Sequence, residues 1–105
     1  MQTTIANPPD HILMYATPYC GDTRRARRVL DELGIAYEFI DLRQDPAAGR
    51  LVEGITGGFR SSPTILFPDG NVLVEPSERE LMAEVEQLQA AGHTLAKAAQ
   101  QFSVA

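Results

Sequence analysis

The chain is short of the features that would tie it to a membrane, a metal ion or a nucleic acid. None of its apolar runs approaches the roughly 20 residues that a helix needs to cross a bilayer. The formal net charge of -5 argues against binding to a nucleic-acid backbone, because like charges repel. The two histidines, His11 and His93, stand at no ligand-like spacing, so we expect no zinc or other mononuclear metal site.

Cysteine is almost absent as well, since Cys20 is the only one in 105 residues. A lone cysteine cannot form a disulfide within the chain, which fits the reducing conditions of the cytoplasm. The first ten residues, MQTTIANPPD, have neither the basic start nor the apolar stretch of a signal peptide. We therefore expect a cytoplasmic protein, and at this length a single domain with one modest core.

What is present is a regular succession of short apolar runs and amphipathic segments. Runs rich in branched and aromatic residues are typical of strands, whereas apolar residues at i, i+3, i+4 and i+7 are typical of a helix. On this basis the expected strands are residues 11–16, 35–42, 64–67 and 72–74, and the expected helices are residues 22–33, 46–56 and 78–92.

The connections between these elements define the expected fold. The turn sequence PDGN at residues 68–71 predicts a hairpin between the last two strands. A β-α-β unit makes the first two strands parallel. The sequence thus predicts an α/β fold with a four-stranded mixed sheet and flanking helices, in the order β-α-β-α-β-β-α. Residues 1–10 are expected to be an N-terminal tail, 11–92 the domain and 93–105 a C-terminal extension.

Several side chains have expected places on the helices. Leu33 and Leu51 belong to the apolar faces of the first two helices, so both are expected to be buried. Asp45 before Pro46 is an N-cap signal, and the SERE sequence at residues 77–80 fits a capping box. The arginine run at residues 24–28 is interpreted as a solvated helix face.

Cys20 lies where the first strand ends and the first helix begins, within the sequence YATPYCGDT. The positive end of a helix and its unpaired N–H groups favour a thiolate. Thr23 can donate a hydrogen bond to the sulfur and Arg24 adds positive charge, whereas the carboxylate of Asp22 opposes the thiolate. We predict that the helix end and Arg24 prevail. The alternative is an inert, buried cysteine.

A second feature supports a reactive site at this junction. Pro63 stands directly before the third expected strand, and the bond that joins it to Ser62 can adopt the cis form at a small cost. A cis proline there would expose the backbone of Ser62 beside Cys20, where an extended thiol-bearing peptide can pair with it. The alternative is a proline that simply starts a strand.

Taken together, the T-x-P-x-C turn, the Ser-Pro-Thr before the third strand and the FPDG of the hairpin resemble the thioredoxin-fold glutaredoxins. The stretch GGFRSSPTILFPDGNVLVEPS resembles the bacterial glutaredoxin-like branch that includes the mycoredoxins. The resemblance implies that Cys20 is the nucleophile, Pro63 the cis proline and Ser62 the residue that pairs with the substrate backbone. It further implies that Ser77 helps to hold the carboxylate of a low-molecular-weight thiol. Thr17 and Tyr19 flank the turn and complete the expected substrate-binding set.

The sequence departs from the family pattern in ways that bear on mechanism. Thr23 stands where redoxins commonly have a second cysteine, so the resolving thiol is missing. The lysine often found before the nucleophile is absent, and Glu75-Pro76 replaces a common Gly-Gly pair. We therefore expect a monothiol oxidoreductase that acts on mixed disulfides, with mycothiol or glutathione as co-substrate and no required cofactor.

Two alternatives come from other functional classes. One is a carrier of an iron–sulfur cluster bridged between two subunits, which Asp22 should disfavour because it adds negative charge near an anionic cluster. The other is a redoxin-fold module that binds partners or senses oxidants through a sulfenic acid on Cys20. For the monothiol oxidoreductase, which is the favoured hypothesis, the expected partners are the low-molecular-weight thiol and S-thiolated proteins. The expected oligomeric state is a monomer.

Overall fold

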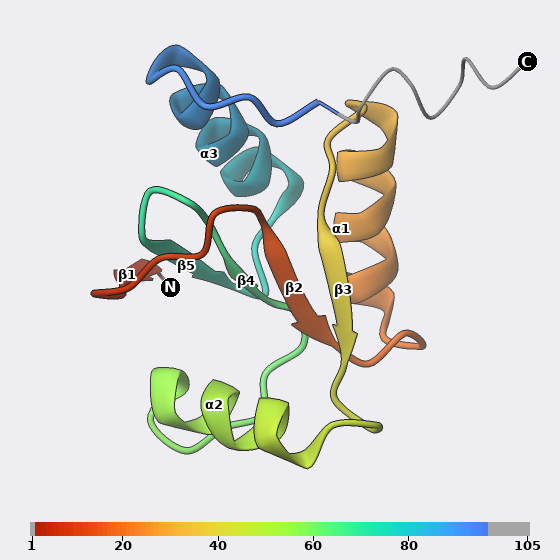
Figure 1. The fold of residues 1–105 in the computed structure, drawn as a ribbon. Coiled ribbons are helices and arrows are strands. Elements are labelled where there is room, and N and C mark those ends of the chain that lie inside the picture. Colours follow the sequence, from red (N-terminus) through yellow and green to blue (C-terminus); the bar gives the residue numbers. More distant parts are fainter. Residues whose placement is uncertain (1, 97–105) are drawn as a thin grey trace, which may run out of the picture.

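Helices cover both faces of a single mixed sheet in the computed structural model, which describes residues 2–96 (Figure 1). The strands lie in the order β1-β5-β4-β2-β3. In chain order the elements are β1 (Gln2–Thr4), β2 (Leu13–Ala16), α1 (Gly21–Glu32), β3 (Glu38–Asp41), α2 (Pro46–Thr56), β4 (Thr64–Leu66), β5 (Asn71–Val74) and α3 (Glu78–Ala90).

The predicted β-α-β-α-β-β-α arrangement is confirmed from β2 to α3. Strand β2 pairs with β3 in parallel and with β4 in antiparallel fashion, and β4 and β5 form the expected antiparallel hairpin. Asp45 caps α2 by accepting a hydrogen bond from the N–H of Ala48, and Gly57 ends the helix at a φ of 84°. The local signals at the ends of the helices therefore act as expected.

The expected N-terminal tail, in contrast, contains a fifth strand. Residues Gln2–Thr4 pair antiparallel with β5, with Thr4 opposite Asn71, and the N–H of Ile5 donates to the carbonyl of Gly70 at 2.8 Å. Three residues without apolar alternation carry no strand signal of their own. The pairing arises because β5 would otherwise leave a row of unpaired backbone groups at the edge of the sheet.

The first residues of the expected C-terminal extension also belong to the packed domain. The N–H of Ala36 donates to the carbonyl of Leu95 at 2.8 Å, Ala96 forms a bridge with Ile35, and Leu95 is buried. The rest of the predicted extension, residues 97–105, lies outside the described residues.

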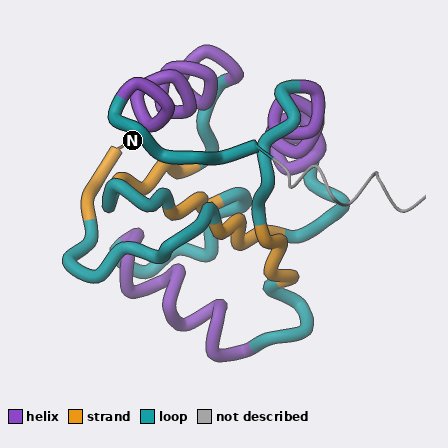
Figure 2. Tube along the Cα trace, turned by 45° about the horizontal axis from the view of Figure 1, so that its top comes forward, coloured by secondary structure: helices purple, strands orange, loops and turns teal. Residues whose placement is uncertain are grey.

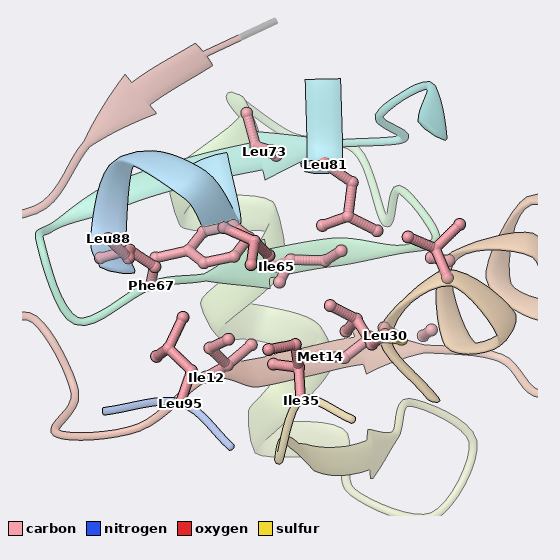
Figure 3. Packing of buried hydrophobic residues seen from close by; sticks show 14 residues of the cluster. Ile12, Met14, Leu30, Ile35, Ile65, Phe67, Leu73, Leu81, Leu88 and Leu95 are labelled. Atoms are coloured by element: carbon pink, nitrogen blue, oxygen red, sulfur yellow. The ribbon is translucent and has the colours of Figure 1, made fainter. Parts of the chain in front are cut away.

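The sheet separates two apolar clusters. Figure 2 shows two helices on one side of the strands and the third helix on the other. The larger cluster lies under α1 and α3, where Leu81 and Leu88 of α3 point toward Ile65 and Phe67 of the sheet (Figure 3). The smaller cluster lies under α2 and includes Val52. Alternate residues of β2 enter the two clusters, as the two-residue period of a strand requires.

Two helical leucines lie at the surface, so the expectation that both are buried is wrong. Leu33 and Leu51 are each 45% exposed. Leu33 is the C-cap of α1, so the helix ends one residue before it, and the last buried apolar residue of the helix is Leu30. On α2 the buried residues Ala48 and Val52 pack into the smaller cluster against the sheet, while Gly49 lies against the guanidinium of Arg60. Leu51 therefore sits at the rim of the buried stripe, about 100° around the helix from Val52.

The topology brings two distant parts of the sequence to one end of the sheet. The arrowheads of β2 and β3 point to the same end, where a turn leads into α1 (Figure 1). Strand β4 runs the opposite way, with Thr64 opposite Tyr15, so the residues before β4 lie beside the residues after β2. Cys20 and Ser62 consequently meet although they are separated by 42 residues.

Candidate active site

Cys20 is the N-cap of α1 and has an extended backbone, with φ -71° and ψ 136°. Its carbonyl accepts the N–H of Arg24 at 3.0 Å, which begins the helical hydrogen-bond pattern. The side chain is half-buried, and its sulfur lies 3.6 Å from the carbonyl oxygen of Ser62. The thiol form can donate to that carbonyl, so the sulfur faces the strand β4 side of the site.

The helix end lowers the pKa of the Cys20 thiol below its ordinary value. The main cause is the backbone N–H of Thr23, with further contributions from the N–H of Asp22 and the hydroxyl of Thr23. Partial burial and the Asp22 carboxylate act in the opposite direction. Unpaired N–H groups in the first turn of a helix stabilise an anion, so the predicted thiolate has a physical basis in this geometry.

The charged side chains near Cys20 differ in their effects from what the sequence predicted, which was that Arg24 supports the thiolate. Arg24 is exposed and is not among the groups that lower the pKa of Cys20, so the N–H groups of the helix end and the Thr23 hydroxyl account for the direction. Asp22 does oppose the thiolate, but its carboxylate forms an ion pair with Arg25. Asp22 and Arg25 stand three residues apart on a helix, a spacing that favours such a pair, although it was not among the sequence predictions.

The hydroxyl group of Ser62 contacts polar groups of both Thr17 and Thr23. Its hydroxyl oxygen accepts the N–H of Thr17 at 2.9 Å and lies 2.9 Å from the hydroxyl of Thr23 and 3.4 Å from that of Thr17. Thr23 is completely buried. The family resemblance implies a role for the backbone of Ser62, and no pattern in the sequence indicates the contacts of its side chain.

The peptide bond between Ser62 and Pro63 is cis. Pro63 is buried, and its carbonyl accepts the N–H of Glu75 at 2.8 Å, which ties this loop to the end of β5. Glu75 is exposed and has a φ of 50°. This left-handed conformation is one that glycine adopts more readily than glutamate.

Tyr19 projects from the site, with 70% of its surface exposed. The guanidinium carbon of Arg43 lies 4.9 Å from the centre of its ring, within the range of a cation–π contact. Arg43 is itself held by two hydrogen bonds to the carboxylate of Asp41, at 3.1 Å and 2.8 Å. No sequence signal connected Arg43 with Tyr19, because the contact depends on the parallel pairing of β2 and β3.

Ser77 lies at the N-terminus of α3 and forms the expected capping box with Glu80. Its hydroxyl accepts the N–H of Glu80 at 3.1 Å, and its own N–H donates to the Glu80 carboxylate at 2.8 Å. The N–H and the hydroxyl of Ser77 are thus both engaged by Glu80. The hydrogen bonds of Ser77 within the described chain join it to α3, whereas Thr17, Thr23 and Ser62 meet around Cys20.

Within residues 2–96, no three side chains of the His, Cys, Asp and Glu types come together in a way that would hold a metal ion. No helix in this part of the chain is long and apolar enough to span a membrane.

A cysteine at the start of a helix, opposite a cis proline on a mixed sheet with helices on both faces, defines a thioredoxin-fold redox protein. Structural neighbours agree. The chain resembles a buckwheat glutaredoxin solved in complex with glutathione, with a TM-score of 0.62 and 24% identity over 78% of this chain and 79% of that one. It also resembles a thioredoxin-like protein, with a TM-score of 0.58 and 27% identity over 74% of this chain and 97% of the other.

The chain belongs to the glutaredoxin family, whose family model matches residues 12–74. Mycoredoxin 1 of Corynebacterium glutamicum is 35% identical over 78 residues, which cover 74% of this chain and 96% of that protein. A Mycobacterium tuberculosis protein that carries a glutaredoxin name is also 35% identical, over 70% of this chain and 88% of its own length. The resemblance to the glutaredoxins and their mycoredoxin branch is thus confirmed.

Proposed function

We propose that this protein is a monothiol oxidoreductase that removes a low-molecular-weight thiol from S-thiolated proteins through Cys20. The observation that carries the proposal is the position of the sulfur. It lies at the N-terminus of α1, where backbone N–H groups lower its pKa, and it faces the cis Ser62–Pro63 segment. A thiolate at neutral pH is the form that attacks a disulfide.

The chemistry requires only one cysteine. The Cys20 thiolate attacks the sulfur of the small thiol in the mixed disulfide, and a new disulfide forms between Cys20 and the small thiol. The protein thiolate leaves and takes up a proton from water. A second molecule of the small thiol, as its thiolate, then attacks the same small-thiol sulfur. This step releases the symmetric small disulfide and restores the Cys20 thiolate.

The backbone of Ser62 is suited to hold the small thiol during this exchange. In a cis Ser-Pro segment before a strand, the N–H and C=O of the serine can pair with an extended peptide-like ligand. The carbonyl of Ser62 lies 3.6 Å from the sulfur, so a ligand bonded to Cys20 would begin at this edge. Thr17 and Tyr19 flank the same sulfur on the preceding loop.

The charges around α3 favour a small thiol without carboxylates. Glu80 already accepts the N–H of Ser77, Glu78 is paired with Arg28, and the exposed Glu75 lies just before this helix start. Glutathione carries carboxylates that these groups would repel, whereas mycothiol, a cysteine derivative of an amino sugar and inositol, carries none. We therefore propose mycothiol, rather than glutathione, as the preferred co-substrate.

The test uses one cysteine peptide thiolated with mycothiol and the same peptide thiolated with glutathione. Mass spectrometry should show the small thiol on Cys20 and the free peptide in solution, and added small thiol should restore the reduced protein. The mycothiol form should react several-fold faster, and Cys20→Ser should abolish the transfer.

Three results would contradict the proposal. Failure of Cys20 to take up either thiol would remove the oxidoreductase function, and a preference for glutathione would overturn the choice of co-substrate. A stable visible absorbance after anaerobic reconstitution with iron and sulfide, without any transfer activity, would favour the iron–sulfur carrier instead.

A further inference from the structure

Three hydroxyl groups from separate parts of the chain meet beside Cys20. Thr17 comes from the loop after β2, Thr23 from the first turn of α1, and Ser62 from the segment before β4. Thr23 has no exposed surface, and its hydroxyl lies 2.9 Å from that of Ser62. Buried hydroxyls in such a cluster must share their hydrogens, since each can donate only one hydrogen bond.

The hydroxyl hydrogens of this cluster can be arranged in more than one way, because a hydroxyl oxygen donates one hydrogen bond and can accept two. The hydroxyl oxygen of Ser62 accepts the backbone N–H of Thr17 at 2.9 Å, which leaves its own hydrogen for one acceptor. The two candidate acceptors are the hydroxyls of Thr23 at 2.9 Å and Thr17 at 3.4 Å, so the closer one is favoured. Once Thr23 accepts from Ser62, its own hydrogen is free to point elsewhere.

The neighbouring sulfur is the group toward which that hydrogen can be directed. Thr23 lies three residues after Cys20 on the first turn of α1, and its hydroxyl is one of the groups that favour the thiolate. In that arrangement the Thr17 N–H donates to Ser62, Ser62 donates to Thr23, and the Thr23 hydroxyl keeps a hydrogen that it can direct to the sulfur. Hydrogen bonds in such a chain polarise one another.

We infer that the Ser62 hydroxyl orients the Thr23 hydroxyl toward the sulfur of Cys20, which makes Ser62 a positioning residue for the thiolate. This role belongs to the Ser62 side chain and is separate from the pairing of its backbone with a ligand. It rests on Cys20 being the reactive thiol, but not on any particular substrate.

Charged groups around the sulfur can also change its titration and must be held constant. On α1 these are Asp22, which is paired with Arg25, and the exposed Arg24. On the β3 side Arg43 lies over Tyr19 and is bound to Asp41. The segment at residues 61–64 supplies no charged side chain. The variants below change none of these charges.

The test measures the pH dependence of Cys20 alkylation by iodoacetamide, which needs no disulfide substrate. Ser62→Ala should move the midpoint upward by about half a pH unit, and Thr23→Val by about one unit, in line with the loss of one hydrogen bond to a charged group. Ser62→Thr keeps a hydroxyl and should retain most of the native midpoint. Ser61→Ala, at the neighbouring serine, is the matched control.

The decisive measurement is the double variant. If Ser62 acts through Thr23, then Ser62→Ala should cause no further upward shift once Thr23 is valine, so the two effects should not add. Additive shifts, or no shift in Ser62→Ala, would overturn the inference. If Thr23→Val does not fold, Thr23→Ser supplies the test, because it should keep the native midpoint and the full effect of Ser62→Ala.

The same series separates this inference from the proposed function. Native protein that transfers no small thiol, yet shows the coupled shifts, would contradict the function and leave the hydroxyl chain in place. Native protein that transfers the thiol normally, but whose Ser62 variants show no coupled shift, would contradict the hydroxyl chain alone.

Discussion

At the scale of single residues, the reactivity of Cys20 depends on which neighbours are neutralised. Asp22 is next but one to the cysteine, and its carboxylate raises the pKa of the thiol. Arg25 forms an ion pair with that carboxylate and so weakens its effect. Since both side chains are about 40% exposed, this pair is a modest influence that salt can screen.

Substitutions at this pair should move the alkylation midpoint of Cys20 in opposite directions. Arg25→Ala leaves the Asp22 carboxylate unpaired and should raise the midpoint by a few tenths of a pH unit, whereas Asp22→Asn removes the negative charge and should lower it. Both shifts should shrink at high salt. Arg50→Ala, at an exposed arginine on α2, is the control and should leave the midpoint unchanged. A lower midpoint in Arg25→Ala would contradict this account.

At the scale of elements, side chains of α1 connect it to its neighbours. Arg27 lies over the ring of Phe39, 4.2 Å from its centre, and donates to the hydroxyl of Tyr37 at 3.1 Å. Arg28 pairs with Glu78 of α3 at 2.7 Å. The arginine run that was interpreted as a solvated face therefore includes side chains that join α1 to β3 and α3.

The start of α3 is held by the capping box of Ser77 and Glu80. Replacing Ser77 with alanine removes the acceptor for the N–H of Glu80, so the free energy of unfolding should fall by about 1 kcal/mol. Urea denaturation at neutral pH measures this change. Ser77→Asp keeps an acceptor at the N-cap and should retain most of the stability. Equal losses in both variants would show that the cap is not what stabilises this helix end.

At the scale of the whole molecule, two titratable groups make the fold respond to pH far from Cys20. Glu84 of α3 is only 4% exposed, and burial together with the nearby Asp69 carboxylate raises its pKa to about 7. Asn71 donates to one of its carboxylate oxygens at 3.0 Å, while the other oxygen has no partner within the described residues. His11, between Asp10 and Glu38, has its pKa raised by its hydrogen bonds to these two carboxylates.

Both shifts should make the folded state less stable as the pH rises. The ordinary pKa of Glu84 is 4.5, so the folded chain binds the proton more tightly than the unfolded chain between pH 4.5 and about 7. Stability is therefore lost across this window, as the buried carboxyl gives up its proton. The stabilising contribution of protonated His11 is fully present below pH 6.5 and is lost as the pH rises through its raised pKa.

The variant Glu84→Gln isolates the contribution of Glu84 to the pH dependence of stability. Urea midpoints at about pH 5 and about pH 8 should differ clearly in the native protein and much less in Glu84→Gln, because the amide does not titrate. Glu86→Gln changes an exposed glutamate on the same helix and should behave like the native protein. A Glu84→Gln variant with the full native pH dependence would assign the effect to other groups.

The sequence by itself determined the elements and their order, because the signals for them are local. Apolar periodicity, the Asp45 cap, the capping box at Ser77 and the PDGN turn each act within a few residues, so they predict helices, strands and a hairpin without knowledge of the fold. The placement of Cys20 between the first strand and the first helix was visible for the same reason. The family resemblance then implied where Pro63 and Ser62 belong.

Only the tertiary structure decided the features that depend on neighbours distant in the chain. Strand β1 exists because it pairs with an edge of β5, and Leu51 is exposed because α2 packs on the sheet through Ala48 and Val52. The contact of Arg43 with Tyr19 requires parallel strands, and the hydroxyl cluster at Ser62 requires β4 to run against β2. A side chain with several possible partners finds them only after the sheet has formed, since spacing along the chain does not limit which partners the fold brings near.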